Sequence, residues 1–168
     1  KGRASVASSA IVTFEQSDMN SLLMRETVRL LFSASTGGRG GREADWLRSG
    51  LSDAVETRQA RMDISEFRQR MRLNLKREGP VTLDELLGRR PMPGDAVSRR
   101  RFRTTASGLT VFLLNLENGL GVRYLLGEIA AGKDLSAAVE RAYPGRFRSM
   151  QELFEVWMEK EVGMVRGR

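Results

Sequence analysis

Cysteine and histidine are both absent from this sequence of 168 residues. Without cysteine the chain forms no disulfide, has no thiol nucleophile and offers no thiolate to a metal ion. Without histidine it has no imidazole base near neutral pH, so neither a Ser-His-Asp triad nor a histidine-ligated zinc site can be built. Much of ordinary hydrolase chemistry is therefore excluded. The lack of cysteine leaves the cellular compartment undecided.

Long hydrophobic runs are also missing. No apolar stretch approaches the roughly 20 residues of a membrane-spanning helix, so we expect no membrane span. Hydrophobic residues make up 40% and charged residues 29% of the chain, which is typical of a folded globular protein. The length suits a single domain, 1–168, with a hydrophobic core of its own.

The net charge of +7 comes mainly from one segment. Residues 89–103 ("RRPMPGDAVSRRRFR") hold six arginines and one aspartate, a charge of +5, which leaves +2 for the rest of the chain. Prolines and a glycine predict a loop here. Its closely spaced arginines, with one aromatic residue among them, allow a nucleic-acid-binding module as one alternative function, although confinement to one loop disfavours it. These are Arg99, Arg100, Arg101 and Arg103.

Helical patterns fill most of the sequence after a short β-rich segment, Ala10–Phe14. We predict a mainly α (α+β) fold with a small N-terminal β element. Capping boxes predict helix starts at three places, Asp63 with Glu66, Thr82 with Glu85, and Ser149 with Glu152. The domain divides into a strand region (1–17), a first set of helices (18–88), the basic loop (89–103) and a C-terminal helical lobe (104–165).

The single predicted strand needs a partner, because a lone strand leaves its N–H and C=O groups unpaired. It can pair with a second copy of the chain as a homodimer, with sequence or a protein that is not part of this chain, or with residues 1–9 as a hairpin. We favour the first two outcomes, because "KGRASVASS" has few β-branched residues and no clear two-residue turn.

Two arginines lie in the unusually apolar stretch "LLMRETVRLLF" (22–32). Apolar residues surround nearly the whole helix, which predicts a buried, central helix. Arg25 and Arg29 lie four residues apart beside Glu26. One interpretation is a narrow polar stripe with an intrahelical Glu–Arg pair that reaches solvent. The alternative is a present or former active-site cleft. In that case we expect a largely buried Glu26 bound to at least one arginine, and a loss of roughly 1–4 kcal/mol in Glu26→Gln.

"RETVR" (25–29) has the frame of the zinc-binding motif HExxH, with arginine at both ligand positions. About twenty residues on, "ADWLRSGLSDAV" (44–55) resembles the "P-x-W-L-x-E-G-L-A" segment of gluzincin metallopeptidases of the peptidase-MA-like group. Trp46, Leu47, Gly50 and Leu51 match that segment. Residues 105–162 are similar to the helical lobe of the same group. The resemblance implies a gluzincin-like helical domain whose third zinc ligand, a glutamate, is replaced by Ser49.

All the ligand positions that the resemblance implies are therefore lost: Arg25, Arg29 and Ser49. Arginine stays protonated and repels a metal dication, and without zinc Glu26 has no metal-bound water to activate. We expect no metal, no cofactor and no enzymatic activity. The resemblance then implies a structural or protein- or peptide-binding module whose arginines bind a carboxylate. It also favours a secreted or periplasmic location.

Other interpretations of single features stay open. An enzyme that uses carboxylates without metal, at Glu26 with Asp53 or Glu56, is a further alternative function. We expect "TGGRGG" (36–41) to be a flexible connection, because it lacks the lysine of a phosphate-binding loop. Tyr143 stands where an oxyanion donor is conceivable, but we expect a packed side chain. Large aromatic residues at helical spacing predict that Trp46 and Trp157 belong to the core.

The missing ligands predict that the purified protein holds no tightly bound zinc. Elemental analysis after exhaustive dialysis checks this. One zinc ion retained per chain would contradict the degenerate-site interpretation.

Overall fold

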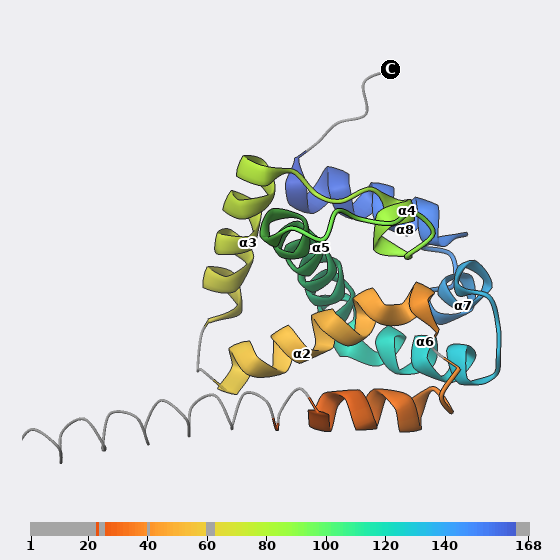
Figure 1. Ribbon diagram of the computed structural model, residues 1–168. Helices are drawn as coiled ribbons and strands as arrows, with labels where there is room; N and C mark the ends of the chain where they lie inside the picture. The colour runs from red at the N-terminus through yellow and green to blue at the C-terminus, as the bar shows by residue number, and fades with distance from the viewer. Residues whose placement is uncertain (1–22, 24–25, 40, 60–62, 164–168) are drawn as a thin grey trace, which may run out of the picture.

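The computed structural model describes residues 23, 26–39, 41–59 and 63–163. This part of the chain is helical and contains no strand (Figure 1), which confirms a mainly helical class. The N-terminal β element lies outside the described residues. The pairing of this element, with a second copy of the chain or with another partner, therefore stays a prediction.

Short connections join the helices into one bundle (Figure 1). A helix at residues 26–35 comes first. The later elements are η1 (Arg42–Ala44), α2 (Asp45–Gln59), α3 (Ile64–Glu78), α4 (Leu83–Leu86), α5 (Ala96–Asn115), η2 (Leu116–Gly119), α6 (Leu120–Ala130), α7 (Leu135–Ala142), α8 (Met150–Trp157) and the π-helical turn η3 (Met158–Val162).

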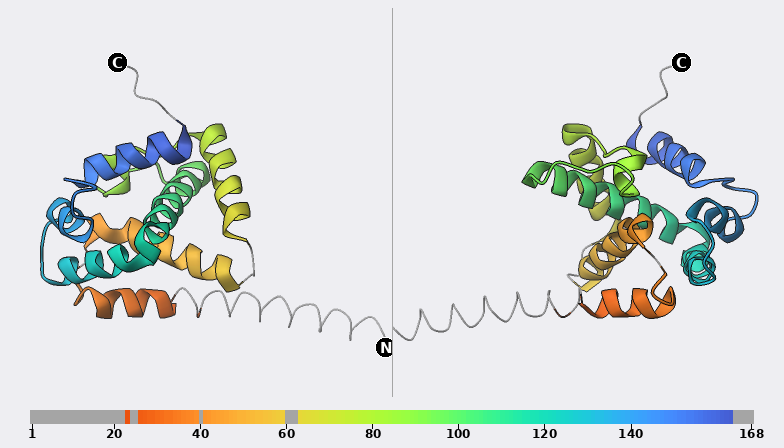
Figure 2. Two further views of the ribbon diagram at one scale, coloured as in Figure 1. Left: turned by 180° about the vertical axis from the view of Figure 1, so that it is seen from behind. Right: turned by 45° about the vertical axis from the view of Figure 1, so that its right-hand side comes forward.

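Helix α5 is the central element, with α2, α3 and α8 around it (Figures 1 and 2). Its middle, "TASGLTVFL" (105–113), is buried throughout. Small residues in this segment let neighbouring elements approach closely. A Cβ added to Gly108 would lie 2.5 Å from the Met71 sulfur and 2.9 Å from the Trp157 ring. The core therefore forms around the small residues of α5.

Helices α2 and α5 approach each other closely at Gly50. A Cβ built there would lie 2.0 Å from Oγ1 of Thr110 and 2.6 Å from the carbonyl oxygen of Ala106. No side chain larger than hydrogen fits this space. The neighbouring Trp46 and Leu47 are fully buried, so the "WLRSGL" segment contributes both core side chains and the helix crossing.

Local capping follows the sequence closely. Thr82 and Glu85 form the reciprocal capping box, and the Ser149 hydroxyl accepts from the Glu152 N–H at 3.2 Å. The Asp63 carboxylate accepts from the Ser65 N–H at 2.7 Å. Its predicted partner Glu66 binds Arg70 instead, so Asp63 is an N-cap here but does not form the predicted capping box.

The basic loop predicted at 89–103 is wrong in its second half. Helix α5 begins at Ala96, where the Asp95 carboxylate accepts from the Ser98 N–H at 2.8 Å. This N-cap stabilises a helix directly after the loop prolines. The boundary at residue 104 consequently falls inside α5. The same helix ends at Asn115, shortly before Glu117 and Asn118, which adopt positive φ angles.

The π-helical turn η3 is fixed to α3 by a buried carboxylate. The Glu161 side chain is only 7% exposed and binds the guanidinium groups of Arg68 and Arg72, the latter at 2.9 Å. Because two cations surround one carboxylate, the buried charge is compensated. The last described turn of the chain is thus linked to the rest of the bundle.

The contact at Gly50 predicts a large asymmetry between two glycine substitutions. Gly50→Ala should lower the free energy of unfolding by about 1–3 kcal/mol, since a backbone carbonyl cannot move aside without separating α2 from α5. Gly127→Ala in α6, where an added Cβ meets nothing within 4 Å, should be neutral or stabilising by up to about 1 kcal/mol. Urea unfolding of both variants checks this. Equal effects would contradict the close crossing.

Candidate functional site

The helix at 26–35 runs antiparallel to α2 and lies beside it (Figures 1 and 2). The connection begins with a compact turn, in which the Gly38 N–H donates to the Ser33 carbonyl at 2.8 Å and the Thr36 hydroxyl donates to the Phe32 carbonyl at 2.9 Å. Positive φ angles at Gly37 and Gly38 explain the first two glycines of "TGGRGG". The chain therefore leaves the 26–35 helix through a tight turn.

This hairpin brings together three of the four residues that sequence analysis assigned to the former site. Glu26, Arg29 and Ser49 line one depression of about 330 Å³. We call it the arginine depression; its other lining residues are Arg48, Ser52, Asp53 and Arg103. Arg25 lies outside the described residues. The structure therefore places the "RETVR" helix and the "WLRSGL" helix on opposite sides of one concave surface.

Glu26 and Arg29 form the expected ion pair, with Nε 2.8 Å from Oε2. The expected burial is wrong, however, since the side chains are 49% and 56% exposed. The prediction of a central helix fails for the same reason. Val28 and Phe32 pack inward at i, i+4, while Leu23, Leu30 and Leu31 are about 60% exposed. Within the described residues only one side of this helix contacts the bundle.

The arginines at the start of α5 bind groups of the same chain. Arg100 donates to both oxygens of Glu78, and these bonds hold the pKa of Glu78 below its usual value. Arg101 donates to the carbonyl oxygens of Gly79 and Pro80. Arg99 donates to the carbonyl of Gly94. These contacts connect α5 to α3 and to the adjoining loops, which leaves less of the basic cluster for a nucleic acid.

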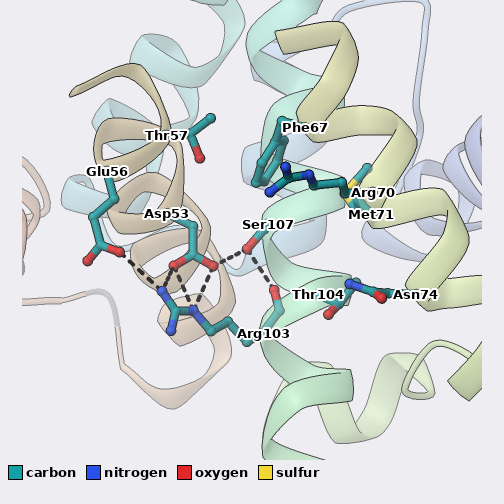
Figure 3. A pocket seen from close by; sticks show the side chains of 10 residues that line it. All are labelled: Asp53, Glu56, Thr57, Phe67, Arg70, Met71, Asn74, Arg103, Thr104 and Ser107. Atoms are coloured by element: carbon teal, nitrogen blue, oxygen red, sulfur yellow. Dashed lines mark hydrogen bonds and ion pairs between the residues drawn. The ribbon is translucent and has the colours of Figure 1, made fainter. Parts of the chain in front are cut away.

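Arg103 forms the most extensive of these networks (Figure 3). Its Nε donates to both oxygens of Asp53 at 2.7 and 3.0 Å, while Nη2 donates to Asp53 and, at 3.2 Å, to Glu56. The hydrogen bonds to Asp53 raise the pKa of Arg103. The Ser107 hydroxyl lies within hydrogen-bonding distance of Asp53 and of the Arg103 carbonyl. This network joins α2 to α5 one turn beyond Gly50.

The network also bears on the carboxylate-enzyme alternative. The Asp53 side chain is only 12% exposed, and each of its oxygens accepts from Arg103. A carboxylate bound in this way is a poor general base, because its lone pairs are already engaged. Glu26 and Asp53 do line the same depression, but each is paired with an arginine.

The large aromatic residues that we predicted to be packed do belong to the core. Trp46, Trp157 and Tyr143 are fully buried. A Cβ on Gly121 would lie 2.1 Å from the Tyr143 ring, so α6 packs directly on it. Burial raises the pKa of Tyr143. This tyrosine is a packed side chain and lies away from the arginine depression.

Among the described residues, no group of three or more Asp or Glu side chains is placed to hold a metal ion. No helix in this part of the chain is long and apolar enough to cross a membrane. Comparison of the chain with family models, curated proteins and solved structures found no match. The resemblance to gluzincins therefore rests on this sequence alone.

The sequence did not predict which residues pair with one another in the Arg103 network. Asp53 and Arg103 are fifty residues apart, and Ser107 has no distinguishing local pattern. Arg48 and Ser52 were also missed, although their spacing from Ser49 on a helix places them near it. Only the crossing of α2 and α5 brings Asp53 together with Arg103 and Ser107.

Removing the Asp53 charge should destabilise the protein far more than removing that of Glu26. We expect Asp53→Asn to cost about 1–3 kcal/mol of unfolding free energy, since a nearly buried carboxylate loses its paired guanidinium bonds. Glu26→Gln should cost less than about 0.5 kcal/mol, because its ion pair is solvent-exposed. Urea unfolding measures both. A larger loss for Glu26→Gln would restore the buried-pair interpretation.

Proposed function

We propose that this chain is a catalytically inactive metallopeptidase-like domain that works as a peptide-binding module, with the arginine depression binding a carboxylate of the ligand. One observation carries the proposal. Glu26, Arg29 and Ser49, which the gluzincin resemblance assigns to the former site, line the same depression. If the matches to the two short motifs were accidental, their residues would have no reason to line the same depression.

The charges of the depression suit an anionic group. Among the described residues, Arg29 and Arg48 each form an ion pair with a carboxylate one turn away on the same helix, Glu26 and Asp45, at 2.8 and 3.0 Å. Exposed pairs of this kind contribute little free energy. Their guanidinium groups can therefore turn to a ligand carboxylate, which they bind through paired, charge-assisted hydrogen bonds. The Ser49 and Ser52 hydroxyls supply two further donors beside them.

The same residues argue against catalysis. A guanidinium at the ligand position of "RETVR" cannot coordinate zinc. The hydroxyls of the depression have no histidine to activate them, because the chain contains none. Binding without turnover is the function that this chemistry supports best.

The proposal predicts that a short peptide binds through its C-terminal carboxylate. A fluorescent peptide with a free carboxylate should bind at least roughly tenfold more tightly than its C-terminal amide, the difference expected for a lost charged hydrogen bond. Arg29→Gln and Arg48→Gln should each reduce that difference. Fluorescence anisotropy measures the affinities.

Arg123→Gln is the matched control, because this arginine is exposed on α6 and is not among the residues that line the depression. It should leave both affinities unchanged. Equal binding of acid and amide, or equal effects of all three arginine substitutions, would contradict the proposal.

A further inference from the structure

A second hollow adjoins the arginine depression. It has a volume of about 300 Å³ and lies between α2, α3 and α5 (Figure 3). We call it the α2–α3–α5 cavity. Phe67 and Met71 from α3 provide its apolar surface, and Met71 also packs against Gly108.

Asp53 and Arg103 line both hollows and therefore form the boundary between them. Arg103 is held there by its bonds from Nε and Nη2 to Asp53, yet its side chain is 48% exposed. Its third nitrogen, Nη1, makes none of the hydrogen bonds found among the described residues. A guanidinium that is fixed on one edge and open on another is a preorganised donor for a peptide carbonyl or carboxylate.

We propose that the α2–α3–α5 cavity is a specificity subsite that takes one large apolar side chain of the peptide. This inference rests on the proposed function, in which the peptide carboxylate binds in the arginine depression. The chain of the ligand then passes over Arg103, whose Nη1 donates to its backbone. The cavity volume lies at the lower limit of ligand pockets, about 300–1,000 Å³, which suits a single side chain.

The spacing along α2 sets the position of that side chain. Ser49 lines the depression, whereas Asp53 and Thr57 line the cavity, four and eight residues further along. At about 1.5 Å per helical residue this is about 6–12 Å. An extended peptide advances about 3.3 Å per residue. The apolar side chain should therefore stand about two to four residues before the C-terminal carboxylate.

The test compares acetyl-Gly-Gly-Phe-Gly-Gly with acetyl-Gly-Gly-Ser-Gly-Gly, both as free acids, by isothermal titration calorimetry on the full chain. The phenylalanine peptide should bind at least roughly tenfold more tightly, as expected for burial of an aromatic ring. Asn74→Phe, which fills the cavity from α3, should abolish this preference. Gln69→Phe is the matched control, since Gln69 is exposed on the same helix and does not line the cavity.

Each outcome decides the inference. A phenylalanine preference that Asn74→Phe removes and Gln69→Phe retains supports it. Equal affinity of the two acids for the wild-type protein, with both weakened by Arg29→Gln, overturns the apolar subsite and leaves the carboxylate site standing. Absence of binding by either acid overturns both. Because the wild-type comparison alone can refute the inference, misfolding of a variant does not remove the test.

Discussion

The contact between Gly50 of α2 and the Ala106–Thr110 segment of α5 is the constraint on which the rest of the bundle depends. It sets the distance between the two helices at a value that only glycine allows. One turn earlier Trp46 and Leu47 enter the core. One turn later Asp53 comes within reach of Arg103 and Ser107. The same crossing thus determines the core on one side and the candidate site on the other.

Ion pairs add further links between the packed helices. The first two turns of α5 are rich in arginine, and there Arg100 and Arg103 bind carboxylates on α3 and α2 respectively. Glu161 adds a link between α3 and η3. These pairs use much of the basic cluster inside the molecule, so an excess of positive charge in the sequence need not mark a nucleic-acid surface. Arg29 and Arg48 differ, since their partners are exposed neighbours on the same helix. The guanidinium groups of these two arginines are therefore open to a ligand in the arginine depression.

Local features of the fold could be predicted from the sequence, because a cap involves residues only two or three positions apart. The capping residues Thr82 and Ser149 show this. The start of α5 was not predicted in the same way. Pro91, Pro93 and Gly94 predict a loop, although Asp95 directly after them is the N-cap of a helix. The burial of the 26–35 helix was also predicted wrongly, since composition alone does not say which elements cover a helix. Ser49 and Arg29 were placed in one site from their motifs, whereas Arg103 and Ser107 required the three-dimensional crossing.

We propose that the arginine depression is a binding site retained from a degenerate metallopeptidase-like arrangement. The most direct measurement of this is a titration of isotopically labelled protein with a C-terminal peptide acid, followed by amide chemical shifts. We expect saturable shifts that concentrate at Arg48, Ser49 and Ser52 and extend along α5 from Arg103 to Ser107. Saturable shifts confined to α6, α7 and α8, with none at these residues, would contradict it.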